Sequence, residues 1–256
     1  MKPTILFLFN SSSYAPAPWV ADGRFNVVSV DYDTTDHAEA HREPLEGVTQ
    51  LSIDLSKTWS VEAVKLALMG LGMAMPSLVV SFAPCTDMAV SGAKHFASKL
   101  AADPECQNRA ARMAQLASKF GCPYIVENPV SILSTLWRKS DVIVQPHRFS
   151  GFIGPEEQAH PDFPGLIPDG DRYRKTTCLW LGNGAMAPLV DSRDPLEEGN
   201  PGWAKLGGKS ARTKYIRSLT PRGLSRAIYA ANYQFILQKV VDKGFLTAKL
   251  AARTGH

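Results

Sequence analysis

The stretch SLVVSFAPC at residues 77–85 decides the fold that this sequence predicts. Its first six residues form a run of apolar and strand-forming side chains, and Pro84 follows almost at once. Such a run is typical of a strand that is buried on both faces of a sheet. Similar short runs lie at residues 4–9, 25–30, 51–53 and 124–126.

Helical patterns alternate with these strands. Apolar residues have helical spacing at residues 16–23, 61–73 and 105–120, and again at 221–241. This alternation predicts an α/β fold with a mostly parallel sheet and helices on both of its faces. Sheets of this kind bind ligands at the carboxyl ends of their strands. The residues at or just past the predicted strand ends are Asn10, Asp31, Asp54, Cys85 and Glu127.

Composition limits the class of protein. The 256 residues are 45% hydrophobic and 20% charged, which suits one α/β domain with a modest insertion. A net charge of +4 permits phosphate contacts without requiring them. None of the four cysteines forms a CxxC pair, so we expect no metal site. We find no secretory signal and no apolar run of the ~20 residues that a membrane helix needs, so we expect a soluble cytoplasmic protein.

Cys85 and Glu127 are candidate catalytic residues because of their positions. A cysteine after a proline, on the loop that leaves a buried strand, can act as a nucleophile if its thiolate is stabilised. The alternative is a small buried hydrophobic residue. Glu127 follows the next buried strand, where a carboxyl group serves either as an active-site acid or as a helix cap. If the two strands are neighbours, the two residues form a nucleophile-and-acid pair.

These motifs resemble those of a known family. Pro84-Cys85, followed later by Glu127-Asn128-Pro129, resembles the Pro-Cys loop and the Glu-Asn-Val loop of the cytosine-C5 DNA methyltransferases. Residues 9–13 (FNSSS) resemble that family's first cofactor motif, Phe-x-Gly-x-Gly, with serines and no glycine. The resemblance implies a Rossmann-like, S-adenosylmethionine-dependent methyltransferase fold. Residues 1–140 and 216–256 would form the catalytic core, and residues 141–215 a reduced target-recognition and DNA-contact region.

The later part of the chain is similar to the short, divergent members of this family that phages encode, which act in the host cytoplasm. Three stretches carry this similarity, QPHRF at residues 145–149, KTTCLW at 175–180 and RSLTPRG at 217–223. Larger members place a Gln-x-Arg-x-Arg motif beside the base. Arg174 and Lys175 are our candidates to replace it, with Arg212 second.

The resemblance assigns roles to individual residues. The catalytic candidates are Cys85, Glu127, Asn128, Arg174 and Lys175. The candidates for binding S-adenosylmethionine are Phe9, Asn10, Ser11, Ser12, Ser13, Asp31, Tyr32, Asp54, Pro84 and Asn232. Asp31 would hold the ribose hydroxyls, Asp54 would lie near the adenine amino group, and Asn232 would help to close the pocket. The candidates for contacting double-stranded DNA are Ser91, Lys94, His95, Arg212 and Arg217, although a solvated surface would explain these residues too.

The function that this resemblance implies is methyl transfer to C5 of a cytosine that is flipped out of DNA, through a covalent bond to Cys85. Two enzymatic alternatives remain, C5 modification of a free pyrimidine nucleotide and the use of a modified S-adenosylmethionine that transfers a larger group. A methyltransferase-like fold that only binds DNA is a third alternative. We expect no obligate protein partner.

Overall fold

The framework of the protein is a seven-stranded sheet, in a computed structural model that describes residues 1–10, 12–32, 45–58, 60–192 and 210–254. The strand order is β3-β2-β1-β4-β5-β7-β6. The strands are β1 (Thr4–Leu8), β2 (Asn26–Asp31), β3 (Val48–Ser52), β4 (Pro76–Ser81), β5 (Tyr124–Pro129), β6 (Val142–Val144) and β7 (Thr177–Gly182).

Strand direction gives the sheet its mostly parallel character. β1 pairs in parallel with β2 and β4, β2 with β3, and β4 with β5. β7 is antiparallel to both β5 and β6, its neighbours on either side. The predicted α/β fold with a mostly parallel sheet is confirmed, and it is compatible with a Rossmann-like arrangement.

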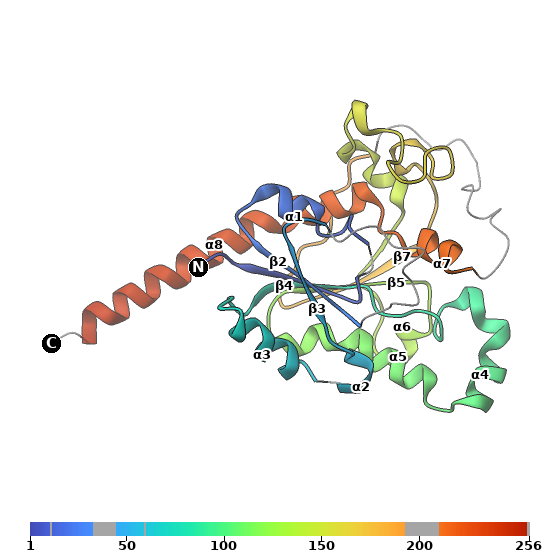
Figure 1. The fold of residues 1–256 in the computed structure, drawn as a ribbon, viewed down its shortest axis with the longest axis horizontal. Coiled ribbons are helices and arrows are strands. Elements are labelled where there is room, and N and C mark those ends of the chain that lie inside the picture. The colour runs from blue at the N-terminus through green and yellow to red at the C-terminus, as the bar shows by residue number, and fades with distance from the viewer. Residues whose placement is uncertain (11, 33–44, 59, 193–209, 255–256) are drawn as a thin grey trace.

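Helices cover both faces of the sheet (Figure 1). α2, α3 and α5 pack on one face, and α1 and the first turns of α8 pack on the other. The C-terminal part of α8 runs out beyond the sheet (Figure 1). The helices are α1 (Ala17–Asp22), α2 (Leu55–Thr58), α3 (Glu62–Gly70), α4 (Phe96–Ala102), α5 (Cys106–Gln115), α6 (Leu133–Leu136), α7 (Ala211–Ser218) and α8 (Arg222–Thr254).

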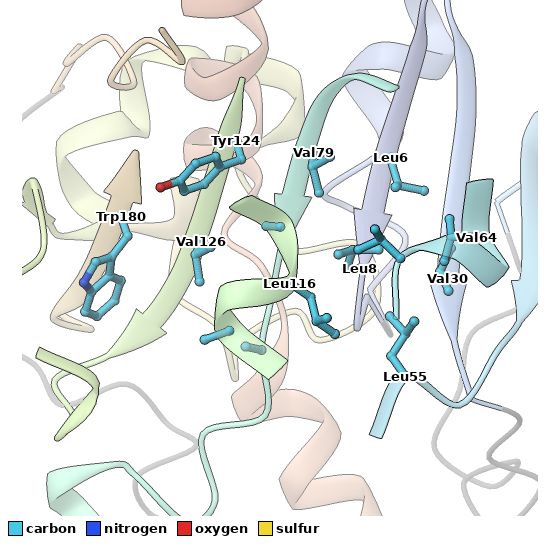
Figure 2. Packing of buried hydrophobic residues seen from close by; sticks show 14 of the residues in the cluster. Leu6, Leu8, Val30, Leu55, Val64, Val79, Leu116, Tyr124, Val126 and Trp180 are labelled. Atoms are coloured by element: carbon cyan, nitrogen blue, oxygen red, sulfur yellow. The ribbon is translucent and has the colours of Figure 1, made fainter. Parts of the chain in front are cut away.

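The apolar strand residues form a core layer on each face. Leu8, Val30, Val79 and Val126 point to the face that α3 and α5 cover, where Leu116 packs against them (Figure 2). The alternate residues of the same strands form the second layer with α1 and α8. Because both faces are buried, the strands read as continuous apolar runs in the sequence.

The predicted division of the chain at residue 140 does not follow the sheet. β6 and β7 fall inside the predicted target-recognition region, yet both pair into the same sheet as β5. β6 has only three residues, and β7 reaches its place through antiparallel pairing across about 50 residues, which no local pattern specifies. No helix within the described residues is both long enough and apolar enough to cross a membrane.

Candidate active site at the carboxyl edge of the sheet

The strand order reverses direction between β1 and β4. From β1 the chain builds β2 and β3 toward one side of the sheet and β4 and β5 toward the other. The carboxyl ends of strands at such a switch point form the usual ligand crevice of open α/β sheets. Phe9 and Asn10 leave β1 at this edge, and Pro84 and Cys85 leave β4 beside them. The main-chain N–H of Phe82 donates to Leu8 O at 3.0 Å, so the two strand ends stay side by side.

The nucleophile candidate lies on a tight turn. Cys85 O accepts hydrogen bonds from the main-chain N–H groups of Met88 (3.0 Å) and Ala89 (2.8 Å). Lys99, on α4, fastens the same turn from outside by donating to Thr86 O at 2.5 Å and pairing with the Asp87 carboxylate at 2.9 Å. The sequence reasoning missed Lys99, because a side chain that reaches back 13 residues leaves no periodic signal.

Asn128 holds this loop from the sheet side. It is fully buried at the end of β5, and its Nδ2 donates to Ala83 O at 2.9 Å. Glu127, the preceding residue, is half-buried on the opposite face of the strand. Because β4 and β5 pair directly, with Ser81 beside Val126, the loop with Cys85 and the end of β5 with Glu127 are neighbours. The expectation that the two strands are neighbours is confirmed, and the roles of nucleophile and acid stay predictions.

Electrostatic effects connect Cys85, Glu127 and Lys175. Burial raises the pKa of the Cys85 thiol, and the negative charge of Glu127 raises it further. Burial also raises the pKa of the Glu127 carboxyl group. The positive charge of Lys175 acts in the opposite direction and lowers the pKa of both groups. Cys85 and Glu127 therefore lie in one partly desolvated site, and the charge of Lys175 acts on both of them.

Lys175 comes to this site from the segment before β7. Its Nζ donates to Arg217 O at 3.1 Å and to Leu219 O at 3.4 Å, at the carboxyl end of α7. Arg174 is exposed on the adjoining surface. Of the two basic residues predicted to replace the larger enzymes' motif, Lys175 is the one that acts on Cys85 and Glu127.

The segment after β1, which carries the predicted cofactor motif, contains no glycine. Phe9 adopts a left-handed conformation with φ of 54°, which is uncommon for a residue with a side chain. Asn10 Nδ2 donates to Ser29 Oγ at 3.5 Å, while its buried Oδ1 has no hydrogen-bond partner among the described residues. Ser12 is buried and its Oγ accepts from the Tyr14 N–H at 3.2 Å, and Ser13 is half-buried. Ser11 lies outside the described residues.

The acidic residues at the ends of β2 and β3 differ in the hydrogen bonds and ion pairs that they make. Asp31 Oδ1 accepts from the N–H of Tyr32 at 2.9 Å, and the Tyr32 side chain is exposed. Asp54 accepts from the N–H and the hydroxyl of Ser56 at the start of α2, and it pairs with Lys57 at 3.1 Å. The hydrogen bonds from Ser56 lower the pKa of Asp54. Asp54 thus accepts hydrogen bonds at the start of α2, and its side chain stays partly exposed at the ligand edge.

Asn232 does not belong to this site. Its Oδ1 accepts from the N–H of Met186, and its Nδ2 donates to Met186 O and Ile228 O. Met186 follows β7, and β7 ends beside Tyr124, at the amino end of β5. Asn232 therefore lies at the opposite edge of the sheet, where it fastens α8 to the chain after β7. The prediction that it closes the cofactor pocket is wrong.

The predicted DNA-contact residues are exposed on two segments near Cys85. Ser91, Lys94 and His95 lie on the 3₁₀ helix Val90–His95, which follows the Cys85 turn. The N–H of Val90 donates to Val130 O at 3.0 Å and so places this helix against the end of β5. Arg212 and Arg217 are exposed on α7, whose last carbonyl groups hold Lys175.

No group of three or more His, Cys, Asp or Glu side chains within the described ranges is arranged to hold a metal ion.

No protein-family model matches the chain, and no curated protein was found to be similar to it. What the protein does must therefore be inferred from the residues and the geometry at the carboxyl edge of the sheet.

Proposed function

We propose that the protein is a DNA cytosine-C5 methyltransferase that uses S-adenosylmethionine and attacks the base with Cys85. One observation carries the proposal. Cys85 follows β4, Glu127 lies in the carboxyl-terminal half of the adjacent parallel strand β5, and the charge of Lys175 acts on both. This set supplies a nucleophile, a hydrogen-bonding acid and a cation within one partly buried site.

Cytosine C5 is a poor nucleophile, so the ring must first be activated. When the Cys85 thiol has lost its proton, the thiolate adds to C6 and the electron pair of the C5–C6 double bond moves to C5. The charge of Lys175 favours the thiolate that this step requires. The carbon then behaves as an enamine carbon and can attack an electrophile.

Glu127 has properties that suit recognition of the base. Burial favours the protonated carboxyl group, which can donate a hydrogen bond to the N3 acceptor of cytosine. Its second oxygen can accept from the exocyclic amino group. Both contacts stabilise the negative charge that spreads to N3 when sulfur adds to C6.

The carboxyl edge also fits the proposed cofactor. The buried Asn10 Oδ1 has no hydrogen-bond partner among the described residues, so it can accept from the ammonium group of the ligand. Asp31, at the end of β2, is the proposed acceptor for the ribose hydroxyls. The sheet, with β7 inserted antiparallel between β5 and β6, is compatible with the Rossmann-like fold that the proposal requires. Bound S-adenosylmethionine supplies an electrophilic methyl group to C5. Loss of the C5 proton to a base then breaks the bond between C6 and Cys85 Sγ.

Duplex DNA is the proposed substrate because the exposed surface beside the site is basic. Lys94, Arg174, Arg212 and Arg217 are all exposed on segments that adjoin Cys85 or Lys175. Phosphate contacts of this kind can offset the few kcal/mol that it costs to unstack a base and swing it into the site.

The proposal is tested by methyl transfer from radiolabelled S-adenosylmethionine to duplex DNA and, separately, to deoxycytidylate. We expect label in DNA, recovered as 5-methylcytosine by mass spectrometry of the nucleosides. Cys85→Ser should lose the activity, while Cys122→Ser, a half-buried cysteine on the turn before β5, should keep it. Label in deoxycytidylate alone, or full activity in Cys85→Ser, would overturn the proposal. A larger added group would identify a modified cofactor.

A further inference from the structure

Lys175 is held by hydrogen bonds at its main chain and at its ammonium group. Its ammonium group is bound by two main-chain carbonyl oxygens at the end of α7, as described above. Its main-chain N–H donates to Gln145 Oε1 at 2.9 Å. The same amide group of Gln145 donates through Nε2 to Thr176 Oγ1 at 2.8 Å. Gln145 thus clamps two consecutive residues 30 positions away in the sequence.

We propose that Gln145 is a positioning residue, whose side-chain amide fixes the turn at Lys175 and Thr176 so that the Lys175 ammonium group stays at the end of α7, where its charge acts on Cys85 and Glu127. The proposal rests on the proposed function only in taking Cys85 as the reactive thiol.

The geometry explains why this turn needs a clamp. The segment of residues 172–176 has no regular secondary structure and leads directly into β7. Arg174 and Thr176 are exposed, so packing does not fix their main chain. Gln145 follows β6, whose last residue pairs with Thr177, and it is therefore anchored by the sheet itself. A rigid strand end thus carries the amide that sets the direction of the Lys175 side chain.

The amide is suited to this role because it is bidentate and neutral. Its oxygen accepts from one main-chain donor and its nitrogen donates to one hydroxyl group, so both of its ends are used. A carboxylate at position 145 would add a negative charge close to Lys175. This charge would oppose the effect that Lys175 has on Cys85.

The test measures the reactivity of Cys85 without DNA or cofactor. Iodoacetamide alkylation of the Cys85 peptide, followed by mass spectrometry at several pH values, reports the thiolate population. When Gln145→Ala releases Lys175, the thiolate loses a favourable charge. We expect alkylation of Cys85 below its pKa to slow by about threefold, as for the loss of one partly exposed charge interaction. Lys175→Met should slow it by the same factor.

The double variant separates positioning from a general structural role. If Gln145 acts through Lys175, Gln145→Ala should have no further effect in the Lys175→Met background. A further slowing in that background, or an unchanged rate in Gln145→Ala alone, would overturn the proposal. Gln238→Ala, which removes an exposed amide on α8, is the matched control and should react as the wild type does.

Thr176→Val provides a milder variant if Gln145→Ala folds poorly. It removes one of the two contacts of the amide and should give a smaller slowing in the same direction, and an unchanged rate would count against the clamp. Because alkylation requires only the thiol, the proposed methyl transfer could fail while this result stands. Conversely, methyl transfer could be found while Gln145→Ala leaves the alkylation rate of Cys85 unchanged, and only the role of Gln145 would then be overturned.

Discussion

Asn128 Nδ2 donates a hydrogen bond of 2.9 Å to the main-chain oxygen of Ala83, two residues before Cys85. This bond joins the end of β5 to the loop that leaves β4, and both of its partners are buried. The residue next to the acid candidate therefore sets the path of the loop that carries the nucleophile candidate. We expect the separation of Cys85 and Glu127 to depend on this contact.

Removing the Asn128 amide should loosen the nucleophile loop. Asn128→Ala leaves Ala83 O buried without its donor, which costs about 1–3 kcal/mol of unfolding free energy. Methyl transfer should fall further than stability does, because the loop can then move away from Glu127. Urea denaturation and an activity assay check both effects. Asn26→Ala, which removes an exposed amide-to-carbonyl bond at the opposite edge, should have little effect, and equal losses in the two variants would contradict this role.

The buried ion pair between Arg222 and Asp171 should dominate the stability of the region that packs on α8. The Arg222 guanidinium binds the Asp171 carboxylate at 2.9 Å and also donates to three carbonyl groups at residues 157–159. Arg222→Met leaves an unpaired buried carboxylate and should cost about 3–5 kcal/mol in denaturant unfolding.

Arg226→Met is the matched control for that substitution. Arg226 pairs with Glu157 at 2.6 Å, but both side chains are partly exposed, so its loss should cost only about 1 kcal/mol. If the two arginine variants were equally stable, the buried network would not have the importance assigned to it.

Glu127 should make stability depend on pH. A carboxyl group whose pKa is raised by folding binds its proton more tightly in the folded chain than in the unfolded chain. Its contribution to stability is therefore complete at pH values below the ordinary glutamate pKa and declines as the pH rises through the raised value. Glu127→Gln removes this decline. The variant should be more stable than the wild type at pH 8, and the difference should shrink toward pH 4.

Unfolding by urea across this pH range gives the comparison for Glu127. A stability difference that is constant with pH, or one that grows toward acid pH, would show that the carboxyl group is not held in a desolvated site.

Gly223 is required where α8 begins against the segment of Phe149. A Cβ atom at position 223 would lie 2.3 Å from the main-chain oxygen of Phe149. Because this oxygen belongs to the backbone, it cannot rotate away, so Gly223→Ala should destabilise the protein by about 1–3 kcal/mol. Gly70→Ala, in α3 where an added Cβ atom would meet open space, should not destabilise the protein. Thermal unfolding measures both variants. A neutral Gly223→Ala would show that the two segments can separate at little cost.

The central strands and their carboxyl ends could be predicted from the sequence. β1, β2, β4 and β5 are buried on both faces, so each reads as an apolar run, and the residue after each run marks the ligand edge. This rule located Cys85 and Glu127 correctly relative to the sheet. The helix predicted at residues 105–120 is in fact α5, followed by the 3₁₀ helix Leu116–Phe120.

The rest depends on long-range contacts that leave no local pattern. The position of β7 between β5 and β6 follows from pairing between distant segments. Lys99 contacts the Cys85 turn through one long side chain, 13 residues away in the sequence. Asn232 was misplaced because a buried asparagine in a helix has the same appearance in the sequence whether it binds a ligand or a neighbouring main chain. Only the structure shows that Met186 and Ile228 use its amide.

Covalent trapping on DNA that contains 5-fluorocytosine tests the central claim most directly. Fluorine at C5 cannot leave as a proton does, so after methyl transfer the bond between Cys85 Sγ and C6 should persist. With S-adenosylmethionine present, we predict a complex of protein and DNA that survives denaturing electrophoresis, with the adduct on the peptide that contains Cys85. If no such complex forms with the wild type, or if it forms equally with Cys85→Ala, then Cys85 is not the nucleophile.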